Sequence, residues 1–268
     1  MGTGRLYRTD GIVIHRRSQG EADRVLRLCT PSGKVDVLAK GARKLRSRKA
    51  GHIELFCRSS FVLSRVPNYW DIISQAETVE PHSRLQSDLL RGTYARYAVE
   101  LLDRFFAQGQ GEAALYDLLN HTLSWLCEAD AEGLDLVARF YEQHLLGLAG
   151  FRPELFRCVG EHGMSEPLQV AEPELSRRPF GFDPERGGVL CPDCYEASRR
   201  TPDVVTLSPR ALQLLRACQG HSYSSLMSQA VPNGLHRELE RAMHHYVTYH
   251  LGHNVRAAAF LHQIRRGR

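Results

Sequence analysis

The stretch RVLRLCTPSGKVDVLAKGARKLRSRK, residues 24–49, decides the fold of the first part of the chain. Apolar residues and arginines alternate up to the turn signal Pro31-Ser32-Gly33, and residues 35–39 form a second β-prone run. Two such runs joined by a Gly-containing turn predict a β-hairpin. Five or six short strands in about 80 residues then predict a small barrel of SH3 or OB type. The further strands are expected at residues 11–17, 52–57, 60–66 and 71–77.

Positive charge is concentrated in the second half of this stretch. All four lysines of the chain lie within residues 34–49, together with three arginines and one acid, Asp36. Seven cations in sixteen residues repel one another unless a polyanion shares the space, which indicates a nucleic-acid backbone as partner. Arginines of the preceding strands could share the same face. The predicted DNA-binding residues are Arg16, Arg17, Lys34, Lys40, Arg43, Lys44, Arg46, Arg48 and Lys49.

The distribution of charge divides the chain. Residues 1–80 carry 15 Lys and Arg against 8 Asp and Glu, whereas residues 81–268 carry 20 against 22. A length of 268 residues also favours two domains. We therefore predict an α+β organisation, with a basic barrel over residues 1–80 and a mainly helical domain over residues 81–268.

Apolar periodicity and capping signals predict the elements of the helical part. Apolar residues at helical spacing from Leu85 to Phe105 predict one amphipathic helix. Ser208-Pro209 is a helix start, with serine as the N-cap and proline at the first helical position. A last long helix is expected over residues 235–261, and an irregular insertion over residues 151–206.

Cysteine usage and missing motifs narrow the functional class. Seven cysteines without disulfide-like spacing, and no signal peptide, predict a reduced, cytoplasmic protein. No apolar run is long enough for a membrane helix. The patterns GxxxxGK[ST], GxGxxG and GxSxG do not occur, which argues against nucleotide hydrolysis and gives no support for other catalysis.

The insertion contains a candidate metal site. Cys191-Pro192-Asp193-Cys194 is a CxxC pair, and Cys158 with His162 lies upstream, so four soft ligands suit one tetrahedral Zn²⁺. Such a closed site is structural, because it has no open position for a substrate. An acid, Glu161 or Glu166, could take the place of His162, and unliganded cysteines are the alternative.

Other interpretations of the basic barrel stay open. A basic run can be a solvated loop, and Tyr69 and Trp70 can pack in a turn instead of stacking on bases. A zinc-stapled RNA-binding protein is the main alternative function, because small barrels with basic loops bind RNA as readily. A zinc hydrolase or nuclease would need an open coordination position on the metal.

Two motifs resemble the RecO family of bacterial recombination mediators. Residues 20–48 carry an acid-x-acid pair, Glu21 and Asp23, then a Thr before a Gly-containing turn and the run AKGAR at residues 39–43. Gly187-Gly188 followed by the CxxC pair resembles the family's cysteine-rich insertion. Zinc-bearing members usually have Cys-x2-Cys-Gly in the first half of the site, where this chain has Cys158-x3-His162-Gly163.

The resemblance implies an N-terminal OB-fold, a helical C-terminal domain and a zinc-binding insertion. It also implies a non-enzymatic DNA-repair protein of the RecFOR pathway, active at the nucleoid, that binds single- and double-stranded DNA and anneals complementary strands. The implied partners are RecR, the single-strand-binding protein SSB and, functionally, RecA, which such proteins help to load on SSB-coated DNA.

Overall fold

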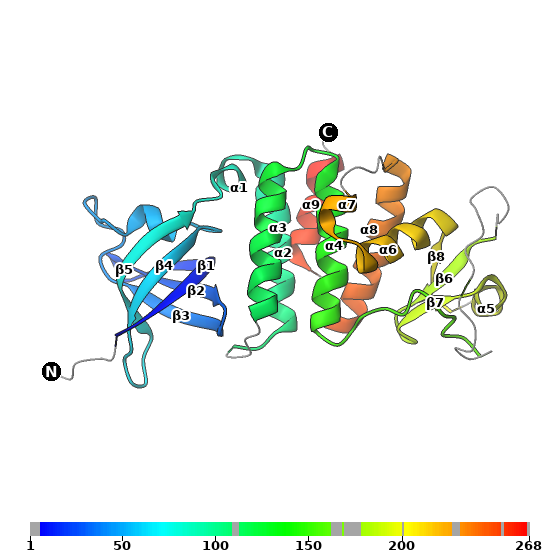
Figure 1. Cartoon of the computed structure of the whole chain (residues 1–268), viewed down its shortest axis with the longest axis horizontal. Coiled ribbons are helices and arrows are strands. Elements are labelled where there is room, and N and C mark those ends of the chain that lie inside the picture. The colour runs from blue at the N-terminus through cyan, green and yellow to red at the C-terminus, as the bar shows by residue number, and fades with distance from the viewer. Residues whose placement is uncertain are drawn as a thin grey trace. The chain divides into compact units, whose positions relative to one another are not determined.

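The computed structural model describes residues 6–108, 113–161, 168, 178–199, 201–226, 231–252 and 255–266. The contacts group the chain into two compact units, Met1–Glu128 and Ala129–Arg268. Among its described residues, the first unit holds the five strands drawn from blue to cyan in Figure 1, three α-helices and one short 3-10 helix. The predicted domain boundary near residue 80 stays a prediction.

The five strands close into a barrel, which confirms the predicted fold class. Their order is β1-β2-β3-β5-β4, and every pairing is antiparallel except a short parallel contact between β3 and β5. The predicted turn between β2 and β3 is also present, and Gly33 in it has φ +112°, a conformation that favours glycine. The strands are β1 (Leu6–Gln19), β2 (Asp23–Thr30), β3 (Gly33–Ala39), β4 (Arg58–Ser64) and β5 (Asp71–Glu80).

The barrel core consists of the alternate residues that point inward from the strands. Leu26 and Leu28 of β2 are fully buried, and so are Phe61 and Leu63 of β4. This period of two is what a half-buried strand requires. It fixes the register and therefore decides which side chains reach the outer face.

The structure corrects the prediction of a strand at residues 52–57. A short 3-10 helix, η1 (Ala50–Ile53), lies there instead, and Ile53 at its end is buried in the barrel core. Phe56 has φ +68°, which interrupts an extended chain. Two backbone hydrogen bonds, Phe56 N to Val13 O and Val13 N to Cys57 O, nevertheless attach this segment to β1.

Three helices complete the first unit, and the expected single helix from Leu85 is divided at Asp88. The Asp88 side chain accepts hydrogen bonds from the backbone N–H groups of Leu90 and Arg91, so it begins a new helix as an N-cap. Sequence periodicity did not reveal this break. The helices are α1 (Ser83–Ser87), α2 (Leu89–Phe105) and α3 (Ala113–Glu128).

A charged cluster attaches α2 to the barrel. The carboxylate of Asp103 on α2 lies 2.6 Å from Lys34 Nζ, 3.3 Å from Arg27 Nη1 and 3.4 Å from His15 Nε2. The hydrogen bond from His15, together with those from Lys34 and the charge of Arg27, holds the pKa of Asp103 well below its usual range.

Replacing Asp103 with Asn is expected to destabilise the protein by roughly 2–3 kcal/mol at pH 7, because Lys34 would then be buried without its counter-charge. A carboxyl whose pKa is depressed by folding stabilises fully above its unfolded pKa of about 4 and loses that contribution at lower pH. Urea unfolding should therefore show a large difference between wild type and D103N at pH 7 and a smaller one below pH ~4. Asp117→Asn, at an exposed position of α3, is the control and should change little. Equal stability of D103N and wild type at pH 7 would contradict the role of the cluster.

The second unit combines helices with a small sheet. The predicted start at Ser208-Pro209 is confirmed, because Ser208 Oγ accepts a hydrogen bond from Ala211 N at 3.2 Å. The expected helix over residues 235–261 is divided where Gly252 takes φ +68° and ends α8. The helices are α4 (Gly133–Leu148), α5 (Pro192–Ser198), α6 (Pro209–Gly220), α7 (Tyr223–Leu226), α8 (Asn233–Leu251) and α9 (Arg256–Arg266).

The insertion at residues 151–206, expected to be irregular, contains regular structure in its described part. Three short strands form an antiparallel sheet in the order β7-β6-β8, and helix α5 follows β7. Strands of three and four residues are too short to give a clear alternation in sequence. They are β6 (Phe180–Asp183), β7 (Gly188–Leu190) and β8 (Val205–Leu207).

Within the described part of the chain, no helix combines the length and the apolar character that crossing a membrane requires.

Candidate nucleic-acid interface and metal centre

The residues that follow β3 form an ordered turn on the barrel. Gly41 N donates to Asp23 Oδ1 at 2.7 Å, and Arg43 N donates to the Ala22 carbonyl at 2.8 Å. Gly41 has φ +66°, and Ala42 is buried in the barrel core. The acid at the start of β2 and the backbone of the residues after β3 thus attach this segment to the turn between β1 and β2.

In this segment, residues 40–48, the cationic side chains are exposed to solvent. A second turn follows, in which Ser47 N donates to the Lys44 carbonyl at 2.9 Å, and Leu45 within it is fully exposed. Long cationic side chains on an anchored backbone form a positive surface whose position is fixed. Exposed in this segment are Lys40, Arg43, Lys44, Arg46 and Arg48.

Arg16 and Arg17, adjacent near the end of β1, differ in their surroundings. Arg16 forms an ion pair with Glu54, which Arg24 also approaches at 3.5 Å. Arg17 lies over the ring of Trp70, with 5.1 Å between the guanidinium carbon and the ring centroid. Arg17 is therefore held close to an aromatic ring by a cation–π contact.

An aromatic pair lies before β5. The rings of Tyr69 and Trp70 are 5.1 Å apart, and Tyr69 is exposed. Tyr7 of β1 donates a hydrogen bond to Asp71, and burial together with that bond raises its pKa to about 12. The exposed ring of Tyr69 offers a surface on which a base can stack.

Lys34 lies apart from the other predicted DNA-binding residues. Its side chain is buried and its ammonium is paired with Asp103, as described above. Six residues of extended strand, about 20 Å, separate it from Lys40 at the opposite end of β3. Lys49 is half-buried, and its Nζ donates to the Ile73 carbonyl at 2.5 Å. Lys34 therefore attaches α2 to the barrel, and Lys49 lies beside β5.

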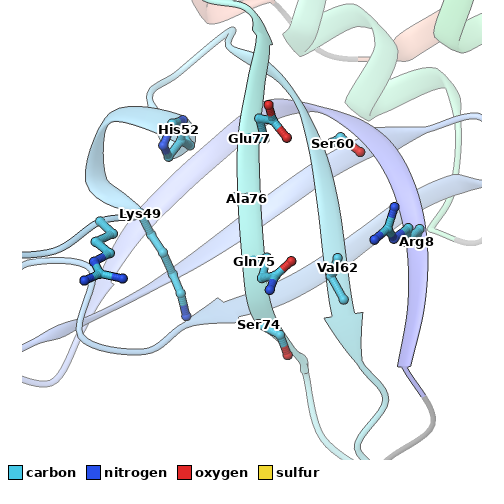
Figure 2. Close-up of a pocket in the computed structure, with 10 residues that line it drawn as sticks. Arg8, Lys49, His52, Ser60, Val62, Ser74, Gln75, Ala76 and Glu77 are labelled. Carbon is cyan, nitrogen blue, oxygen red and sulfur yellow. The ribbon is translucent and has the colours of Figure 1, made fainter.

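Sequence reasoning missed a pocket on the outer face of the barrel. It has a volume of about 590 Å³ and is lined by residues of β1, β4 and β5 and of the segment that ends in η1. Figure 2 shows Arg8, Val62 and Gln75 on three neighbouring strands. No local signal could reveal it, because its walls come from three strands and from a separate segment that only the folded barrel brings together.

Three cysteines of the second unit converge. The Sγ atoms of Cys158, Cys191 and Cys194 all lie within 4.8 Å of one another, and no other such group of metal-binding side chains is found among the described residues. Sulfurs bound to one Zn²⁺ at ~2.3 Å lie roughly 3.8 Å apart, so a small contraction closes the site. The predicted fourth ligand, His162, lies outside the described residues, as does Glu166.

Backbone N–H groups lie close to the sulfur atoms of two of the cysteines and can donate hydrogen bonds to them. Gly160 N and Cys191 N approach Cys158 Sγ at 3.4 and 3.2 Å, and Cys194 N approaches Cys191 Sγ at 3.5 Å. A Cβ atom at Gly160 would lie 2.4 Å from Cys194 Sγ, so only glycine fits there. Burial, followed by the neighbouring thiols, raises the pKa of Cys194 to about 11, so a bound cation is needed to hold the thiolates. The cluster can therefore hold a metal ion.

The chain resembles known proteins along almost its whole length. Residues 3–82 match the family model described as "Recombination protein O N terminal", and residues 86–258 match "Recombination protein O C terminal". The protein named "DNA repair protein RecO" of Roseiflexus sp. (strain RS-1) is 35% identical over 261 residues, which are 97% of this chain and 87% of that protein. Proteins of the same name include those of Desulforudis audaxviator, 35% identical (96% and 97% covered), and Symbiobacterium thermophilum, 33% identical (98% and 99%).

Proposed function

Because the chain belongs to the RecO family of DNA repair proteins, we propose that it is a recombination mediator that binds DNA through the basic surface of its barrel. One observation carries this proposal: five exposed cations stand on a backbone segment that hydrogen bonds fasten to the barrel. Such a surface neutralises phosphates and releases counterions without reading sequence.

We further propose that the positive charge of this surface promotes the annealing of complementary DNA strands. Two DNA strands repel each other, and a cationic surface that screens both of them lowers the barrier to pairing. This action needs no bond to be made or broken in the DNA, so we propose that the protein is not an enzyme. Single- and double-stranded DNA are both expected ligands, because the phosphate backbone is common to them.

The proposed partners follow from the family resemblance. We propose that the protein cooperates with RecR on DNA coated by the single-strand-binding protein SSB, in the cytoplasm at the nucleoid, and so helps to load RecA. The three cysteines with a fourth ligand, His162 or a neighbouring acid, are proposed to hold one structural Zn²⁺. When bound, that ion would tie Cys158, which precedes the small sheet, to the CxxC pair after β7.

We expect the protein to accelerate the annealing of complementary oligonucleotides that are coated with SSB, in moderate salt and without any nucleotide. The measurement is the rate of duplex formation, followed by fluorescence transfer between labels on the two strands. The matched control is the same protein with Lys40, Arg43, Lys44 and Arg46 replaced by Ala. Absence of acceleration by the folded, metal-loaded protein, together with a preference for RNA over DNA of equal length, would instead favour an RNA-binding protein.

A further inference from the structure

The pocket on the outer face of the barrel has one wall of strand residues, which includes the acid Glu77, and a second wall that is cationic. Arg8 of β1, Val62 of β4 and Gln75 of β5 are in register across three strands. Ser60 and Glu77 form the next row, one step along β4 and β5. Figure 2 shows Glu77 and Ser60 together on one side of the pocket and Arg8 beyond Val62 on β1.

The remaining wall comes from the chain that leads into η1. Arg48, Lys49 and His52 line the pocket there. Lys49 gives one hydrogen bond to the Ile73 carbonyl, and an ammonium has three donors, so a second acceptor can be bound as well. Thr78 N donates to His52 Nδ1 at 3.2 Å, which places the proton of the neutral ring on Nε2. This wall therefore supplies donors and positive charge.

One class of ligand matches both walls. A nucleotide carries a phosphate that pairs with arginine and lysine, and a base whose edge pairs with amide and carboxylate groups. A volume of about 590 Å³ lies within the range of ~300–1,000 Å³ typical of small-ligand pockets. An acidic peptide fits less well, because Glu77 would repel it.

We propose that this pocket binds one nucleotide of a single DNA strand. The phosphate on one side of the nucleotide lies on Arg48 and Lys49, the phosphate on its other side lies on Arg8, and its base edge lies on Gln75 and Glu77 between them. The assignment rests on the proposed DNA-binding function and goes beyond it by giving the barrel a base preference. The carboxylate of Glu77 accepts a hydrogen bond from an exocyclic amino group, which cytosine and adenine carry and thymine lacks. The pocket therefore selects amino-bearing bases, and Arg48 links it to the exposed cations that precede it in the chain.

The test compares the affinity of the full chain for oligo(dC) and oligo(dT) of equal length, measured by fluorescence anisotropy. Both are pyrimidine strands with the same phosphate charge, so the ratio of their affinities isolates the base contact. Wild type should prefer oligo(dC) by roughly fivefold or more. Glu77→Ala should bring the ratio close to one, whereas Glu128→Ala, at an exposed acid of α3, should leave it unchanged. Arg8→Ala should weaken both affinities and preserve the ratio, because a phosphate contact carries no base information.

The outcomes separate this inference from the function on which it rests. Equal wild-type affinity for the two strands, or an unchanged preference in E77A, would overturn the pocket assignment while leaving DNA binding intact. Binding of neither strand at low salt would overturn the proposed function itself. Free dCMP, tested as a competitor, should displace oligo(dC) only weakly; affinity equal to that of the strand would show that the pocket serves a soluble nucleotide.

Discussion

Replacing Lys40, Arg43, Lys44 and Arg46 with Ala is expected to weaken single-stranded DNA binding by roughly 100- to 1,000-fold at 0.1 M salt. Each lost phosphate contact on a single strand lowers the slope of log affinity against log salt by about 0.7, so the slope should fall by about 3. The loss should be similar for different sequences, because the contacts are to the backbone. Titrations at several salt concentrations measure both quantities.

A charge-matched variant is the control for this experiment. Arg152, Arg210, Arg237 and Arg241 are exposed in the second unit, and their replacement removes the same net charge outside the basic segment. If that variant lost as much affinity and as much salt slope, overall charge would explain the binding. If the quadruple variant of the basic segment kept the wild-type slope, the anion-binding surface would lie elsewhere.

The sequence predicted where the positive charge lies but not which cations share a surface. Lys34 and Lys40 are six residues apart in one cationic run, yet the first is buried against Asp103, which lies 69 residues further along the chain. Composition cannot reveal such a partner, because the contact depends on how α2 packs on β2 and β3. Asp23 is a similar case, because its carboxylate at the start of β2 accepts a hydrogen bond from Gly41 N, which follows β3 and lies 18 residues further along the chain. DNA contact by the remaining basic residues stays a prediction.

Local chemistry made some elements predictable and left others hidden. The start of α6 at Ser208-Pro209 was predictable, because the capping hydrogen bond joins groups only three residues apart in the chain. The barrel was predictable as a class from turn signals and alternation, and its closure through the β3–β5 contact was not. The pocket depends on the register of three strands and on the β-bulge near Ser74, so it became visible only in the structure. The metal cluster was predictable in part, since CxxC is a local motif.

Replacing Cys191 with Ser is expected to lower the zinc content of the purified protein from about one ion per chain to near zero and to destabilise the second unit. Structural zinc stabilises isolated zinc-finger peptides by about 10–16 kcal/mol, and losing even about 3 kcal/mol here would lower the unfolding midpoint by roughly 10 °C. Affinity for DNA at low temperature should change much less, because the proposed binding surface lies in the first unit. Metal analysis and thermal unfolding followed by circular dichroism measure the first two effects.

Two comparison variants make this expectation specific. Cys127 is a partly exposed cysteine of the first unit and does not belong to the cluster, so Cys127→Ser should keep full metal content. His162→Ala should release the metal if the histidine is the fourth ligand, whereas release by Glu161→Gln instead would assign the acid. A C191S protein that kept its stability but lost DNA affinity would show that the metal site acts in binding directly. Unchanged metal content in C191S would mean that the converging cysteines hold no ion, and the insertion would then depend on its sheet alone.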